Sequence, residues 1–227
     1  MKHPQFKMLL YFLCGLLVMA LTAWLLAGPL ALGHATAGIL LAVVFLVAAI
    51  FMEFAAQGII LKESFSFPAK RRLFRVSYLL NAVASGCAVG SVLMDKQIAV
   101  NEELFLALLP AAVLAILFSL LADKTFSIVF IVLAIALCVG AICFWIFVSA
   151  TMGCMALFSG LYLLLFPIGL RHAVRAPKEW SRYLSYTGFG AFFVIFIAAL
   201  LILSDGEALD GVDLDFGHSS RKKKRLQ

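Results

Sequence analysis

Long uninterrupted apolar runs constrain this chain more than any other feature of its sequence. Residues 126–170, for example, contain no charged side chain at all. A helix that crosses a bilayer needs about 20 consecutive apolar residues, and several runs reach that length. Because these runs are continuous and do not alternate with polar residues, they predict helices and not the strands of a membrane barrel.

The composition excludes a soluble protein. Hydrophobic residues make up 64% of the chain and charged residues 13%, whereas a soluble domain carries about 45–50% and about 25%. A soluble domain of this size could not hide so much apolar surface from water. The sequence therefore predicts an all-α fold, a polytopic bundle of transmembrane helices.

Seven spans are predicted within a single transmembrane domain, residues 1–203. They cover residues 8–28, 35–61, 73–94, 104–122, 126–148, 151–170 and 184–203. Six or eight spans are the alternatives, because the fourth span contains Pro110 and the fifth and sixth share one apolar stretch. Pro110 and Pro167 are expected to kink their helices. Residues 204–227 are predicted to form a mobile tail, first acidic and then basic.

The distribution of Lys and Arg predicts an orientation. With the N-terminus in the cytoplasm, the cytoplasmic connections receive Lys2, Lys7, Lys62, Lys70, Arg71, Arg72, Arg75, Lys124, Arg171, Arg175, Lys178 and Arg182. The outer connections receive only Lys96. Membrane proteins keep basic loops inside, so we expect a cytoplasmic N-terminus, in a plasma membrane or a bacterial inner membrane. The side of the C-terminus stays open, because seven spans would put the basic cluster at residues 221–225 outside.

Four polar residues interrupt the second and third predicted spans: Glu53, Gln57, Ser77 and Asn81. Glu53 lies nine residues before Lys62 and Asn81 nine residues after Arg72, so each is expected about 13 Å inside the same membrane boundary. A short loop joins the two spans, which predicts antiparallel neighbours whose polar side chains meet. An ionised carboxylate facing lipid at that depth costs about 2.5–3.5 kcal/mol, so Glu53 is expected to face the bundle or a water-filled cavity.

Two interpretations of this polar cluster remain open. In the first, Glu53 binds a proton or a cation in a transport path, and the two amides are its hydrogen-bond partners. In the second, the cluster only ties helices together, each bond contributing about 0.6–2 kcal/mol. The sequence offers no second intramembrane acid and no intramembrane cation at matching depth that would relay a proton.

Two further groups of residues carry interpretable patterns. Ala82, Gly86 and Gly90 are four residues apart, a spacing that permits close helix packing. The loop after the sixth span combines basic and aromatic residues, which are typical of the headgroup layer. These residues, which could also contact anionic lipid or a partner protein, are Arg171, Arg175, Lys178, Trp180 and Arg182.

Catalytic and metal-binding motifs are not found. The sequence contains no H-E-x-x-H or G-x-S-x-G motif, and its histidines and cysteines are scattered among the predicted spans. We therefore expect no catalytic residue, metal or cofactor, and no nucleic-acid partner. The expected contacts are the lipid bilayer and other membrane protein subunits.

Three functional hypotheses follow. The first is a non-catalytic subunit or accessory factor of a larger membrane complex, suggested by the short loops and the small-residue packing faces. The second is a small-solute or ion transporter that uses Glu53 as its coupling acid. The third is an intramembrane enzyme of unrecognised type, which would require Glu53 to face an enclosed pocket accessible to lipid.

Overall fold

The computed structural model describes residues 3–28, 35–59, 66–98, 103–121 and 128–204. All regular secondary structure in these ranges is helical. Seven segments are long and apolar enough to cross a membrane: Pro4–Ala27, Ala35–Gln57, Phe67–Asp95, Leu104–Leu121, Val129–Phe147, Ala150–Arg175 and Pro177–Leu203. The predicted all-α bundle with seven spans is therefore confirmed. The predicted tail lies outside the described residues, apart from Ser204.

The helices are α1 (Pro4–Ala27), α2 (Ala35–Gln57), α3 (Phe67–Asp95), α4 (Glu103–Leu106), α5 (Leu109–Leu121), α6 (Ile128–Phe147), α7 (Ala150–Leu164), α8 (Phe166–Arg175), the short 3-10 helix η1 (Pro177–Glu179) and α9 (Trp180–Leu203). Two spans are interrupted. The break between α4 and α5 precedes Pro110, and the break between α7 and α8 precedes Pro167. Proline cannot donate the helical hydrogen bond and crowds the preceding turn, which accounts for both positions.

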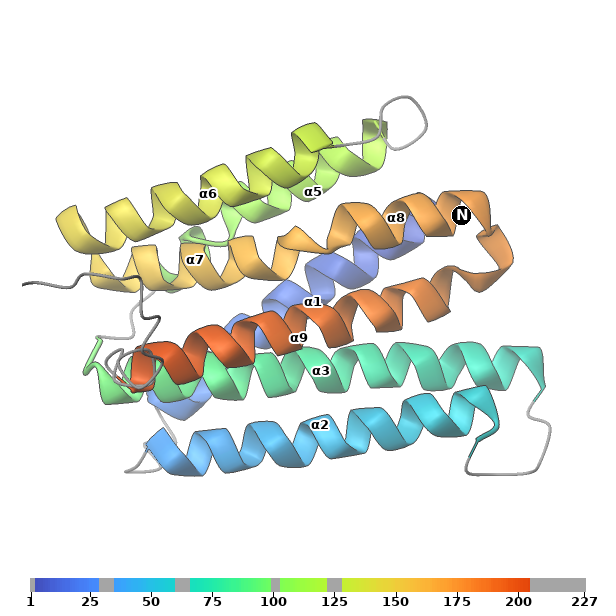
Figure 1. The fold of residues 1–227 in the computed structure, drawn as a ribbon, viewed down its shortest axis with the longest axis horizontal. Helices are drawn as coiled ribbons and strands as arrows, with labels where there is room; N and C mark the ends of the chain where they lie inside the picture. Colours follow the sequence, from blue (N-terminus) through green and yellow to red (C-terminus); the bar gives the residue numbers. More distant parts are fainter. Residues whose placement is uncertain (1–2, 29–34, 60–65, 99–102, 122–127, 205–227) are drawn as a thin grey trace, which may run out of the picture.

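Helix α3 lies at the centre of one half of the bundle. It is the most buried of the seven spans and packs against α1, α2 and α9. Figure 1 shows α2 along one side of α3 and α9 along another, with α1 crossing behind them. Helices α5 and α6 lie at the opposite edge, and α6 packs mainly against α7.

Small residues on α3 allow α1 to approach closely. A Cβ atom built on Gly86 would lie 2.5 Å from the Met19 carbonyl oxygen, and one on Gly90 would lie 3.1 Å from the Leu26 Cβ. Ala82, on the same face, is fully buried. This small-residue face is thus occupied by a helix of the same chain.

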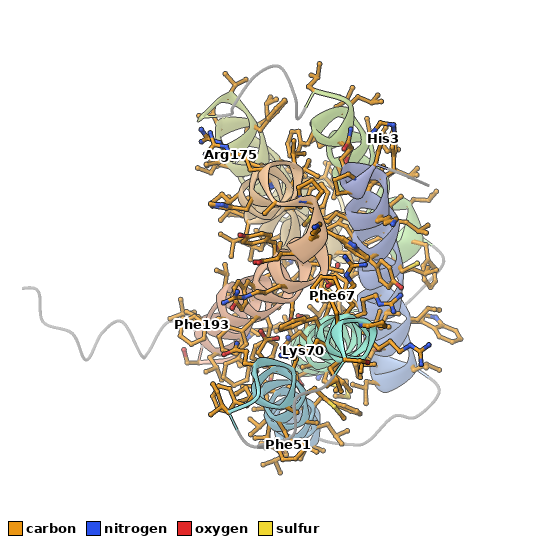
Figure 2. The ribbon with its side chains drawn as sticks, turned by 90° about the vertical axis from the view of Figure 1, so that its right-hand side faces the viewer. His3, Phe51, Phe67, Lys70, Arg175 and Phe193 are labelled. Carbon is orange, nitrogen blue, oxygen red and sulfur yellow. The ribbon has the colours of Figure 1, made fainter. Side chains whose placement is uncertain are left out.

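The outward faces of the bundle are apolar. Val44 on α2, Val132 on α6 and Phe193 on α9 are each more than half exposed, together with many other large hydrophobic side chains. Figure 2 shows such side chains projecting from several helices, among them Phe51 and Phe193. A soluble protein rarely exposes so continuous an apolar surface to water, so these faces contact the lipid bilayer.

Basic residues gather at one end of the bundle, which we call the basic end. The starts of α1, α3 and α9, and the ends of α2 and α8, lie there (Figure 1). Lys70 and Arg175 are both visible when this end faces the viewer (Figure 2). The opposite end holds the ion pair between Asp95 and Lys96, with 3.2 Å between its charged atoms. The uneven distribution of Lys and Arg along the sequence therefore becomes a difference in charge between the two ends of the bundle.

Helix α2 ends earlier than the apolar run suggested. Gly58 adopts a left-handed conformation with φ of 77°, its N–H donates to the Ala55 carbonyl, and the N–H of Ile59 donates to the Phe54 carbonyl. This pair of bonds forms a Schellman cap, which terminates a helix at glycine. Glu53 consequently lies one turn from the end of α2, about 6 Å along the helix axis.

Candidate functional site

The Glu53 carboxylate receives hydrogen bonds from two helices. The Gln57 side-chain amide, one turn away on α2, donates to Oε1 at 3.2 Å. The Ser185 hydroxyl on α9 donates to Oε2. Both donors are neutral, so they hold the carboxylate without cancelling its charge.

Ser77 on α3 extends this network between the two helices. Its hydroxyl donates to the carbonyl oxygen of Ala49 on α2 at 3.0 Å, and its oxygen lies 3.1 Å from the Ser185 hydroxyl oxygen. Ser77 and Ser185 are both buried. Glu53, Gln57, Ser77 and Ser185 therefore form one polar network, hereafter the Glu53 network, which joins α2, α3 and α9.

Asn81 does not join the Glu53 network. It lies one turn beyond Ser77 on α3 and is 1% exposed. Neither its amide nitrogen nor its side-chain oxygen has a hydrogen-bond partner among the described residues. Ser77, Asn81 and Ser85 are four residues apart, so they line one buried face of α3 that leads from Glu53 toward the middle of the bundle.

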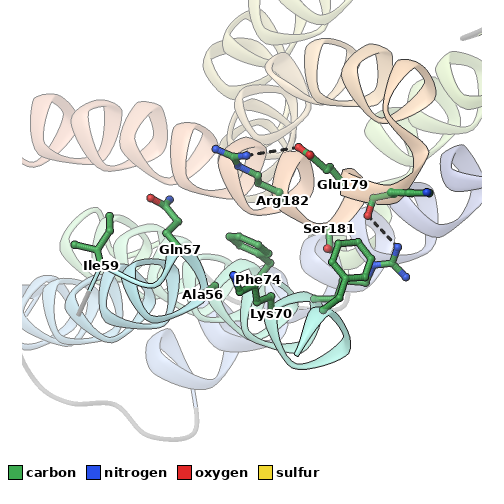
Figure 3. Close-up of a pocket in the computed structure, with 11 residues that line it drawn as sticks. Ala56, Gln57, Ile59, Lys70, Phe74, Glu179, Ser181 and Arg182 are labelled. Carbon is green, nitrogen blue, oxygen red and sulfur yellow. Dashed lines mark hydrogen bonds and ion pairs between the residues drawn. The ribbon is translucent and has the colours of Figure 1, made fainter. Parts of the chain in front are cut away.

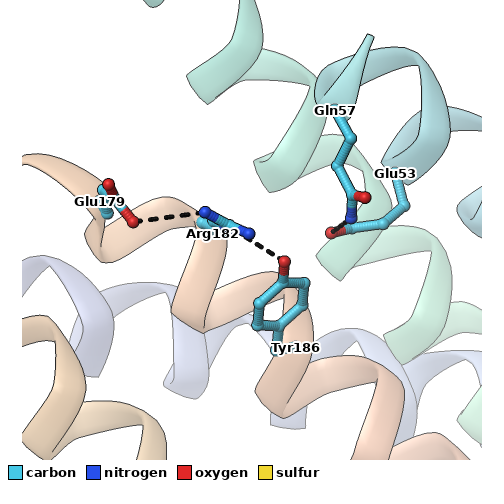
Figure 4. Close-up of polar contacts among 5 residues, drawn as sticks. All are labelled: Glu53, Gln57, Glu179, Arg182 and Tyr186. Carbon is cyan, nitrogen blue, oxygen red and sulfur yellow. Dashed lines mark hydrogen bonds and ion pairs between the residues drawn. The ribbon is translucent and has the colours of Figure 1, made fainter. Parts of the chain in front are cut away.

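No basic side chain neutralises Glu53 within the described part of the chain. The nearest turn of α9 carries Arg182, but its Nε donates to the Tyr186 hydroxyl at 2.7 Å and its Nη1 lies 3.5 Å from Glu179. Figure 4 shows Arg182 with Tyr186 on α9 and with Glu179 of η1, opposite Glu53 and Gln57 on α2. The acid is thus held by neutral groups while the guanidinium is bound elsewhere.

Two cavities open between α2 and α9, above the surface of α3. The deeper one, about 260 Å³ in volume, is lined by Ala49, Ile50, Glu53, Phe54, Ser77, Tyr186 and Phe189. Its walls are almost entirely apolar apart from the Glu53 network. We call it the Glu53 cavity.

The second cavity lies at the basic end, one helical turn from the first. It has a volume of about 420 Å³ and is lined by Ala56, Gln57, Ile59, Phe67, Lys70, Arg71, Phe74, Lys178, Glu179, Ser181 and Arg182. Figure 3 shows its wall of α2 residues, its floor on α3 and the start of α9 on the far side. Four cations and one carboxylate line it, so we call it the basic cavity.

The five loop residues expected at the headgroup layer divide between different surroundings. Lys178 and Arg182 line the basic cavity. Trp180 is buried beside Tyr11, with 5.6 Å between ring centroids, and the Lys7 ammonium lies 5.9 Å from its ring. Arg171 and Arg175 belong to α8 and do not line the cavity.

Sequence reasoning missed the contribution of α9. Ser185 and Tyr186 lie in the last predicted span, far from Glu53 in the chain, and single hydroxyl residues are common in membrane helices. One weak signal existed: Ser181 and Ser185 are four residues apart, which places both on one face of that helix. Nothing in the sequence indicated that this face would turn toward α2.

No group of three or more His, Cys, Asp or Glu residues in the described ranges could hold a metal ion. Comparison with protein-family models, curated proteins and solved structures gives no match to this chain. Inferences about its function therefore depend on the geometry of the two cavities.

Proposed function

We propose that this multi-spanning membrane protein is a non-catalytic transporter of a small solute or ion, with Glu53 as its coupling acid. The observation that carries the proposal is the position of the Glu53 carboxylate, which lines a cavity and, among the described residues, is held only by neutral donors. Such a group can gain and lose a proton, or bind a cation, without first breaking an ion pair.

The buried face of α3 supports the same proposal. Ser77, Asn81 and Ser85 continue inward from the Glu53 cavity, and the Asn81 amide has both of its polar atoms free to bind. A buried polar group without a partner costs about 1–3 kcal/mol. A transport path explains that cost, because the amide would then meet a passing solute or water.

A role as a subunit or accessory factor of a larger complex is less well supported by the geometry. The small-residue face on α3, which suggested it, packs against α1. An intramembrane enzyme would need a reacting group beside Glu53, and the described lining of the Glu53 cavity offers only hydroxyls of Ser77 and Tyr186. Both roles stay predictions.

The proposal is tested by measuring currents from the purified chain in liposomes. A panel of monovalent cations, amino acids and small organic acids is applied with and without a pH gradient. We expect at least one solute to give a current that depends on the gradient, and Glu53→Gln to abolish that dependence. The glutamine carbonyl oxygen can still accept the Ser185 hydrogen bond, and the glutamine NH2 group can donate to the side-chain oxygen of Gln57, so expression and thermal stability should hold.

Glu179→Gln is the matched control, because it removes the acidic side chain that lines the basic cavity and leaves the Glu53 network intact. Its currents should match those of the wild type. If Glu53→Gln loses only thermal stability and keeps gradient-dependent currents, the network is structural. If no solute on the panel gives a current and the chain instead purifies with a stoichiometric partner, the subunit role replaces the transporter.

A further inference from the structure

The basic cavity has no role in the proposed coupling mechanism, yet four cationic side chains line it. Lys70 and Lys178 have no hydrogen bond or ion pair for their ammonium groups within the described ranges. Arg71 donates from Nη2 to the Lys178 carbonyl oxygen at 3.0 Å and lies 4.2 Å from the centre of the Phe67 ring. Its Nε is buried and has no partner. Several cationic side chains in the basic cavity are thus available to bind one anion.

The position of the cavity restricts which anion fits. It lies at the basic end, where the apolar faces of α2 and α9 stop, which is the depth of lipid headgroups. The Glu53 cavity begins one turn further along the same gap, and its walls are apolar side chains such as Ile50, Phe54 and Phe189. A ligand that occupies the basic cavity and extends along these apolar side chains therefore has an anionic head and an apolar chain.

We propose that the basic cavity binds the phosphate of an anionic phospholipid, whose acyl chain runs along the apolar wall of the Glu53 cavity. In this site Lys70, Arg71 and Lys178 contact the phosphate. Arg182, which is held by Tyr186 and Glu179, forms the remaining side of the site. Guanidinium and ammonium groups are the usual donors to phosphate oxygens. This site does not depend on transport and holds equally for a chain that carries no solute.

The affinity of the full-length protein in detergent for dioleoylphosphatidylglycerol is measured by native mass spectrometry, with dioleoylphosphatidylcholine as the uncharged comparison. We expect one tightly held phosphatidylglycerol and much weaker phosphatidylcholine. A cation near a lipid phosphate contributes roughly 1 kcal/mol, so Lys70→Gln should weaken phosphatidylglycerol binding about fivefold. Equal affinity for the two lipids would overturn the proposal.

Arg72→Gln is the matched control for Lys70→Gln. Arg72 lies two residues away on the same turn of α3, is exposed, and does not line the cavity. Its loss should change the affinity by less than about twofold, since a freely solvated cation contributes little. Equal losses in both variants would show general attraction to a basic surface, which contradicts a built site.

A second pair of variants tests the acyl chain. Ile50→Trp fills part of the Glu53 cavity and should weaken phosphatidylglycerol binding, whereas Val47→Trp, which faces outward on α2 and does not line the cavity, should not. Free glycerol phosphate provides the third arm. If it displaces the lipid at comparable concentration, or if Ile50→Trp binds normally, the ligand is a soluble phosphate and the lipid assignment is wrong.

Discussion

The hydroxyl of Ser185 on α9 donates a hydrogen bond to Glu53 on α2, two residues that are 132 positions apart in the sequence. Helices α2 and α9 each pack extensively against α3. This bond therefore connects two helices across the gap that contains both cavities. It also fixes the carboxylate at the mouth of the Glu53 cavity.

Ser185→Ala should loosen this connection. A hydrogen bond between membrane helices contributes about 0.6–2 kcal/mol, and we expect the free energy of unfolding to fall by that amount. A double-mutant cycle with Glu53→Ala, which removes the acceptor, isolates the coupling between the two residues when it is measured by denaturant titration in mixed micelles. Ser181→Ala is the control, because Ser181 lies one turn earlier on α9 and makes no bond to Glu53. Equal effects from both serines would contradict the assigned bond.

Gly86→Ala should separate α1 from α3. The new Cβ would lie 2.5 Å from the Met19 carbonyl oxygen and 2.6 Å from the Thr22 Cβ. Because the first of these atoms is backbone, a helix has to move, and overpacking of this kind costs about 1–3 kcal/mol. The measurement is the midpoint of thermal unfolding in detergent.

Gly140→Ala provides the comparison for Gly86→Ala. Gly140 lies on α6, and a Cβ there meets no atom within 4 Å. Alanine also has the higher helix propensity, by about 1 kcal/mol in water. This variant should therefore be neutral or slightly more stable. A Gly140→Ala protein as unstable as Gly86→Ala would mean that α6 has a packing partner that the chain itself does not supply.

The overall architecture was predictable because one physical constraint dominates it, the need to satisfy backbone hydrogen bonds inside lipid. Apolar runs of bilayer length have to form spanning helices, since lipid offers the backbone no hydrogen bonds. The small residues on α3 likewise predicted close packing, although their spacing could not name α1 as the partner. Packing between distant helices depends on the whole bundle, and the pairing of Ser185 with Glu53 was for that reason not predicted.

The end of α2 shows a signal that was present in the sequence but given too little weight. Gly58 follows a long apolar run, and glycine in that position commonly ends a helix. Hydropathy alone carries the span on to residue 61, because Ile59, Ile60 and Leu61 are apolar. Giving the cap precedence over hydropathy would have ended the predicted helix at Gln57, one turn beyond Glu53.

Asn81→Leu separates a structural role of Asn81 from a functional one. Leucine has nearly the same shape and removes two buried polar atoms that have no partner. If nothing else occupies the site, stability should rise by about 1–3 kcal/mol, the cost of an unsatisfied polar group. In the transporter, solute-dependent currents should fall in the same variant. Thermal unfolding and liposome currents measure the two effects separately.

Ser85→Ala is the control for Asn81→Leu. The Ser85 hydroxyl lies one turn further along the same face of α3 and donates to the Asn81 backbone oxygen at 2.8 Å. Because this bond stays within one helix, its loss should change stability by about 0.6 kcal/mol or less. A drop in stability on Asn81→Leu would contradict the expected gain and would indicate that an ordered water or ion binds the amide.

The orientation of the bundle is tested by labelling single cysteines with a membrane-impermeant maleimide, after replacement of the five native cysteines. Arg175 lies at the basic end and Gln97 at the opposite end, and both are exposed. Because Lys and Arg are retained on the cytoplasmic side, Gln97→Cys should be labelled in sealed cells and Arg175→Cys only after permeabilisation. The reverse pattern would invert the bundle and place the basic cavity in the outer leaflet. The lipid that it binds would then have to come from that leaflet, whereas the hydrogen bonds around Glu53 would be unchanged.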